Sequence, residues 1–126
     1  MAYIQPVPQP FHTVVETPEF AAGARHVLTS AERASLIGFL AESPRAGDLI
    51  VGTGGARKLR WSAKGKGKRS GARVITFYAG PDLPVFLLAV FGKGEKVNLS
   101  KAERNELQTV LAGVADDYLK GAKRHD

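Results

Sequence analysis

The sequence contains no cysteine. This absence excludes disulfide bonds, thiolate metal ligands and a cysteine nucleophile. Long apolar runs are also missing: the longest, residues 83–91, has the length of a strand and contains Pro84, whereas a membrane-spanning helix needs about 20 apolar residues. The first ten residues, MAYIQPVPQP, have neither the charged nor the apolar region of a secretory signal peptide. We therefore expect a soluble, cytoplasmic protein without a membrane partner.

Several motifs that carry chemistry are absent as well. No Gly-Lys pair is followed by Ser or Thr, as a P-loop requires, and the G-x-S-x-G turn of serine hydrolases does not occur. The three histidines, His12, His26 and His125, lack the spacing of a metal-ligand pair. Residues 52–55 (GTGG) lack the third glycine of a dinucleotide fingerprint, and we interpret them as flexible turns. The sequence predicts neither a metal nor a cofactor.

The chain does have a concentration of positive charge in residues 57–73 (RKLRWSAKGKGKRSGAR). Eight of its 18 Lys and Arg lie there without one acidic residue, while the remaining ten stand against 12 Asp and Glu. A local excess of this kind on a balanced domain is typical of nucleic-acid binding; a solvated charged loop is the alternative. The eight cations are Arg57, Lys58, Arg60, Lys64, Lys66, Lys68, Arg69 and Arg73.

Apolar periodicity and capping signals predict one domain over residues 1–126, with a proline-rich arm at about 1–10. Residues 11–16 are typical of a strand and residues 19–27 of a short helix begun by Pro18. Thr29 and Glu32 have the spacing of a capping box, which begins a helix that ends before Pro44. That helix is expected to pack by Ala34, Ile37, Leu40 and Ala41.

The second half predicts the rest of the sheet. Residues 46–55 are expected to form a loop with an extended piece at 49–51, and residues 56–62, 72–79 and 85–91 to form strands, the last of them central. Residues 63–71 are expected to be a loop that joins the first two of these strands in a hairpin. A second capping box, Ser100 and Glu103, begins a final helix. Its expected apolar stripe is Leu107, Val110, Leu111, Val114 and Tyr118, followed by a polar tail at 120–126.

These elements define an α+β fold: a small, mainly antiparallel sheet with two N-terminal helices and a C-terminal helix. Alternation along the first hairpin strand places Leu59 and Trp61 toward the core and Lys58 and Arg60 on the other face. We expect Arg73, just across the hairpin, to face solvent with them.

Three segments resemble the HigB-type toxins of the RelE/ParE superfamily. They are G-T-G-G with R-K-L-R at 52–60, G-K-G-K-R-S-G-A-R-V-I at 65–75 and L-L-A-V-F-G-K-G-E at 87–95. The resemblance covers roughly residues 11–118, including the start of the last helix at 99–107. It implies a RelE-like fold and the toxin of a type II toxin–antitoxin system, an endoribonuclease that cleaves mRNA on the ribosome and is held inactive by an antitoxin protein.

The resemblance also implies a mechanism, in which the ribose 2′-OH attacks the adjacent phosphate without a metal. Such a reaction needs a base, cations that stabilise the phosphorane and an acid for the departing 5′-oxygen. By motif position, Lys58, Arg60 and Arg73 are the implied phosphate clamps, and Lys66 or Lys68 the proton-transfer group. Further implied RNA contacts are Arg57, Lys64, Arg69 and Lys93. Two other functions stay open: a ParE-like toxin that inhibits DNA gyrase by binding, and an RNA-binding module without catalysis.

Overall fold

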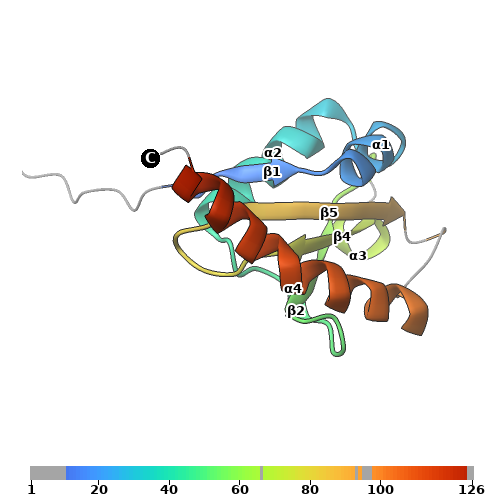
Figure 1. Ribbon diagram of the computed structural model, residues 1–126. Coiled ribbons are helices and arrows are strands. Elements are labelled where there is room, and N and C mark those ends of the chain that lie inside the picture. Colours follow the sequence, from blue (N-terminus) through green and yellow to red (C-terminus); the bar gives the residue numbers. More distant parts are fainter. Residues whose placement is uncertain (1–10, 66, 93, 95–97, 125–126) are drawn as a thin grey trace, which may run out of the picture.

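The computed structural model describes residues 11–65, 67–92, 94 and 98–124 of the chain. The predicted α+β class is confirmed: a five-stranded, mostly antiparallel sheet lies between helices (Figure 1). The strand order is β1-β5-β4-β3-β2; β1 runs parallel to β5, and the other pairs are antiparallel. The elements are β1 (Val14–Glu16), α1 (Pro18–Val27), α2 (Ser30–Glu42), β2 (Asp48–Leu49), β3 (Ala56–Trp61), α3 (Gly67–Ser70), β4 (Ala72–Phe77), β5 (Val85–Gly92) and α4 (Lys101–Arg124).

Two apolar clusters fill the two faces of the sheet. The first lies under α1 and α2 and includes Phe20 and Leu36, and the second lies under α4 and includes Leu111. Figure 1 shows α4 across one face, with α1 and α2 on the other side. Along β4, Val74 belongs to the first cluster and Ile75 to the second, and all six residues of the strand are buried. The sheet is therefore a middle layer, and its central strands have no solvated face.

The predicted packing faces of two helices need correction. In α2, the buried residues are Leu36 and Leu40, whereas Ala34 is exposed, because the helix packs on the first cluster through its two leucines, one turn apart. The stripe of α4 is narrower than predicted: Val110 is 50% and Tyr118 44% exposed. Among the described elements, α4 is the one helix on its face of the sheet, so no second layer of described residues buries its outer side.

The loop and tail predictions also change. Residues 63–71 contain the single-turn helix α3, and α4 continues through Arg124, beyond the predicted start of the polar tail at 120. The extended piece predicted at 49–51 begins one residue earlier and ends at Leu49, as β2. The proline-rich arm at 1–10 lies outside the described residues. In the part of the chain that is described, no helix combines the length and apolarity needed to cross a bilayer.

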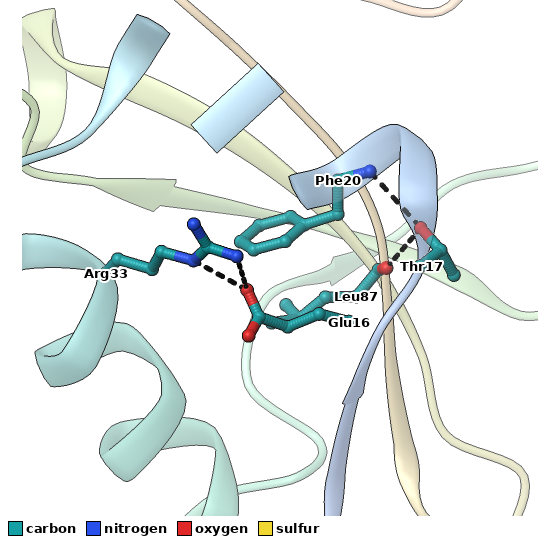
Figure 2. A network of polar contacts seen from close by, with 5 residues as sticks. All are labelled: Glu16, Thr17, Phe20, Arg33 and Leu87. Atoms are coloured by element: carbon teal, nitrogen blue, oxygen red, sulfur yellow. Dashed lines mark hydrogen bonds and ion pairs between the residues drawn. The ribbon is translucent and has the colours of Figure 1, made fainter. Parts of the chain in front are cut away.

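The turn between β1 and α1 is held against β5 by the side chain of Thr17 (Figure 2). Its Oγ1 accepts a hydrogen bond from Phe20 N (3.2 Å), as an N-cap does, donates to Leu87 O (2.8 Å) and lies 3.1 Å from Leu88 O. Leu88 is the extra residue of a β-bulge, since Ile75 pairs with residue 89 but the next residue pairs with Leu87. The threonine therefore binds carbonyl oxygens at the point where the ladder between β4 and β5 is interrupted.

An ion pair holds the beginning of α2 against β1 beside the same junction (Figure 2). Arg33 donates from Nε and Nη2 to Glu16 Oε2, at 2.7 and 2.6 Å, and its guanidinium lies 5.9 Å from the centre of the Phe20 ring. Both charged side chains are about 30% exposed, at 30% and 28%. Because both side chains are partly exposed to water, the pair orients α2 more than it adds free energy of folding.

The GTGG segment is an ordered turn and not the flexible one predicted. Thr53 is fully buried, and its Oγ1 donates to Ile50 O (2.7 Å) and accepts from Ala56 N (3.0 Å). Ile50 N donates directly to Ala56 O (2.9 Å), so the threonine hydroxyl closes the last rung between β2 and β3. Gly52 and Gly54 have φ angles of 83° and 79°, a region that glycine adopts without strain.

Gly71 tests the packing of the α3 turn. A Cβ at this position would overlap Trp61 O and lie 2.5 Å from Gly67 O and 2.7 Å from Ala63 N, all of them main-chain atoms. We expect Gly71→Ala to lower the free energy of unfolding by about 3 kcal/mol, as overpacking of a rigid site does. Chemical denaturation measures this value.

Gly38→Ala is the matched control, because nothing lies within 4 Å of a Cβ there. In the middle of α2 it should raise the free energy of unfolding by up to about 1 kcal/mol. Equal stability of the Gly71→Ala protein and the parent would contradict the packing.

Candidate nucleic-acid interface

The basic stretch begins on β3, where the neighbouring strand β2 ends early. β2 pairs with β3 only at Arg57 and Lys58, so that residues 59–61 have β4 on one side and, within the described ranges, no strand on the other. A groove of about 420 Å3 follows this edge. The groove is lined by Phe39, Gly47, Asp48, Lys58, Leu59, Arg60, Trp61 and Lys68.

Three of the predicted site cations meet in this groove. Lys58 and Arg60 leave β3 on one face, as the alternation predicts, while Lys68 comes from α3 on the opposite face. Lys58 Nζ donates to Asn98 Oδ1 at 2.5 Å, a contact across 40 residues of sequence. The short β2 is what lets side chains from both faces of the sheet reach one concavity.

Aromatic rings form the wall from which Lys68 projects. Its ammonium lies 5.0 Å from the centre of the Trp61 ring and 5.9 Å from that of Phe39, within the range of a cation–π interaction. The two rings are 5.2 Å apart and inclined by 40°. Trp61 Nε1 donates to Glu32 O (3.1 Å), which fixes the ring against α2. The groove thus combines cations with a fixed aromatic wall.

Glu32 anchors the basic loop to α2. The predicted capping box is present: Glu32 Oε1 accepts from Thr29 N (2.9 Å) and Thr29 Oγ1 accepts from Glu32 N (3.1 Å). The same carboxylate also accepts from Lys64 N (2.8 Å) and Gly65 N (3.1 Å). The backbone N–H groups of Thr29 and then Lys64, together with that of Gly65, hold the pKa of Glu32 at about 2, below its usual value of 4.5.

Arg73 is buried, at 4% exposure, so the expectation that it faces solvent is wrong. It pairs directly with Arg60 across the ladder and shares its face of the sheet, yet Arg60 is exposed. The difference is the position of the strand: β3 borders the open edge, whereas β4 lies between β3 and β5. The Arg73 guanidinium therefore lies beneath the surface, where its Nη1 donates to Ala72 O (3.4 Å).

Of the remaining predicted contacts whose side chains the structure describes, Arg57 and Lys64 do not line the groove. Arg57 Nη1 donates to Gly47 O (3.0 Å) and so supports the turn before β2. Lys64 is exposed, with a φ angle of 52°, in the turn that Glu32 holds. The backbone of Arg69 lies in α3, and Lys66 and Lys93 lie outside the described residues.

Sequence reasoning missed four residues of this region. Asp48, Phe39 and Asn98 are isolated polar or apolar positions in the sequence, and no spacing relates them to the basic stretch. Glu32 was identified only as a helix cap. The capping-box pattern does not indicate that backbone N–H groups 32 residues later, such as that of Lys64, also donate to its carboxylate. Their roles depend on the tertiary fold.

The groove holds one carboxylate, Asp48, among its lining residues. Among the described residues, no group of three or more His, Asp or Glu side chains is placed to hold a metal ion. No protein-family model matches the chain. The site is therefore characterised by its own geometry: a cationic groove with an aromatic wall at an open sheet edge.

Arg60 and Arg73 provide a matched pair of substitutions. Arg73→Ala should lower the free energy of unfolding by about 2 kcal/mol, because it removes a buried side chain and the packing of its aliphatic stem. Arg60→Ala, directly opposite on the exposed strand, should change it by less than about 0.5 kcal/mol. Urea denaturation compares the two, and equal losses would contradict the burial difference.

Glu32→Gln tests the anchor through its pH dependence. A carboxyl group whose pKa is lower in the folded than in the unfolded chain stabilises the fold above the unfolded pKa and loses that contribution as the pH falls toward 2. The variant should be less stable at pH 7 by about 1 kcal/mol, and the gap between the two proteins should narrow from about pH 5 to about pH 2.

The measurement is the urea midpoint of both proteins at several pH values. Glu106→Gln, an exposed position on α4, serves as the control and should leave the midpoint unchanged. If the stability difference between Glu32→Gln and the parent stayed constant with pH, the negative charge of Glu32 would not contribute to the anchor.

Proposed function

We propose that this protein is the toxin of a type II toxin–antitoxin system, a ribosome-dependent mRNA endonuclease that cleaves by attack of the 2′-OH on the adjacent phosphate. One observation carries the proposal: Lys58, Arg60 and Lys68 line a single groove together with Trp61 and Phe39. Phosphate contacts and stacking surfaces are the two means by which proteins hold unpaired RNA. The resemblance of the sequence motifs to HigB-type toxins favours RNA cleavage over RNA binding alone.

The groove supports charge stabilisation from two sides. Lys58 and Arg60 on one wall and Lys68 on the other can surround a phosphate whose negative charge increases as the 2′-oxygen attacks. Arg73 is not a direct phosphate contact in this mechanism, since it is 4% exposed.

Proton transfer completes the reaction. The 2′-OH loses its proton to a base, the new bond from the 2′-oxygen to phosphorus forms a 2′,3′-cyclic phosphate, and the departing 5′-oxygen takes a proton from an acid. Lys68 is our candidate for one of these transfers, because the aromatic wall holds its ammonium at the groove. Neither transfer needs a metal ion.

A cognate antitoxin would inhibit such a site most simply by placing acidic side chains over the groove. The formal charge of the chain is +6, and three exposed or half-exposed cations converge on one concavity. Complementary charge favours fast association and selects the partner.

The test is induced expression of single variants, read out by growth and by primer extension on cellular mRNA. Lys58→Ala, Arg60→Ala and Lys68→Ala should each lower cleavage by about 100-fold, the usual cost of one group that stabilises transition-state charge. Arg25→Ala, an exposed cation on α1, should cleave like the parent.

The readout separates the three candidate functions. Discrete cuts in translated mRNA that disappear in the three groove variants support the endonuclease. Intact transcripts with damaged DNA would instead indicate gyrase inhibition, and RNA binding without cuts would indicate a non-catalytic module. Full cleavage by all three folded variants would contradict the site.

A further inference from the structure

The other side of β2 is an open sheet edge. β2 is the last strand in the order of the sheet. In its ladder, Ile50 N donates to Ala56 O, and Asp48 is opposite Lys58 two residues earlier. Since inward and outward groups alternate along an antiparallel strand, the N–H and C=O of Leu49 point away from β3. An edge of this kind can accept an added strand.

Apolar side chains flank that edge. Val51 is 90% exposed and Leu49 61% exposed, although natural sheet edges are commonly protected by charges or proline. Ile50, between them, packs against the cluster under α4. The segment therefore turns one side chain into the core and leaves two large apolar ones in solvent.

Basic residues border the apolar side chains. A pocket of about 340 Å3 is lined by Ile50, Val51, Gly52, Lys101, Arg104 and Asn105. Lys101 and Arg104 stand one turn apart at the beginning of α4, and Arg104 Nη1 is 3.5 Å from Leu99 O. An anion between them would interact with two cations beside an apolar surface.

The edge is held in place before any partner arrives. Thr53 closes the turn after β2 from a fully buried position. The turn also lies against α4, because a Cβ on Gly54 would be 3.7 Å from Gln108 Cα. Figure 1 shows this turn projecting from the sheet beside α4. Little ordering of the chain is required on binding, which favours affinity.

We propose that this edge binds an extended, acidic segment of another protein. The segment pairs with Leu49 as a sixth strand, covers Leu49 and Val51 with apolar side chains and places a carboxylate between Lys101 and Arg104. A second copy of this chain fits less well, since it would bring its own Lys101 and Arg104 and a formal charge of +6 to the same place. The proposal does not rest on the endonuclease activity.

The test uses the full chain and a synthetic nine-residue peptide of alternating valine and glutamate. Titration calorimetry measures affinity, and amide hydrogen exchange locates the contact. We expect the bound peptide to slow exchange of the Leu49 amide. A peptide with lysine in place of glutamate, and one with N-methylated valines that cannot pair as a strand, should each bind at least tenfold more weakly.

Variants place the site on the protein. Val51→Asp should weaken binding at least tenfold, whereas Val110→Asp, at an exposed valine of α4 that does not line the pocket, should not change it. Lys101→Ala and Arg104→Ala should each weaken binding several-fold, and Lys120→Ala should have no effect. Sedimentation of the chain alone should show a monomer.

Three results would overturn the proposal. They are unchanged exchange of the Leu49 amide in the complex, equal affinity of the parent and Val51→Asp, and a dimer that Val51→Asp dissociates. The last would assign the edge to self-association. Binding that Lys58→Ala weakens and Val51→Asp does not would move the peptide to the groove on the other side of β2.

Discussion

The carboxylate of Glu32 is the interaction on which the candidate site depends. It begins α2 through the capping box and receives the backbone N–H groups of Lys64 and Gly65. The main-chain oxygen of the same residue accepts from Trp61 Nε1. One residue of a helix terminus thus fixes both the aromatic wall and the turn that leads to α3. These hydrogen bonds offset part of the entropy that a segment rich in glycine and lysine loses on taking a single conformation.

The second constraint is the burial of the sheet on both faces. Helices cover both sides, so a cation on the central strand β4 becomes buried, as Arg73 is, whereas the cations of β3, next to the short edge strand β2, can reach a ligand. The shortness of β2 then opens that edge beyond Lys58. Charge in the sequence shows where cations are; the order of the strands decides which of them a ligand can touch.

Local signals in the sequence identified most of the elements. Both capping boxes, the proline that begins α1 and the apolar run of β5 are short-range patterns with a local physical cause, and each lies where predicted. The site was predicted only in part. Lys58, Arg60 and Lys68 meet in one groove, but the burial of Arg73 and the roles of Phe39 and Asp48 depend on strand order and helix packing, which no local pattern contains.

The bulge in β5 has a consequence for how chains of this architecture vary in length. Leu88 and Ala89 are neighbours in sequence and both face the cluster under α4, so the strand carries one residue more than its alternation requires. Losing Leu88 would leave Phe91 and Val90 on their present sides, and would remove a side chain packed on that cluster and a carbonyl that Thr17 contacts. We therefore expect this central strand to tolerate the loss of one residue, because the deletion would not turn the rest of the strand to the other face of the sheet.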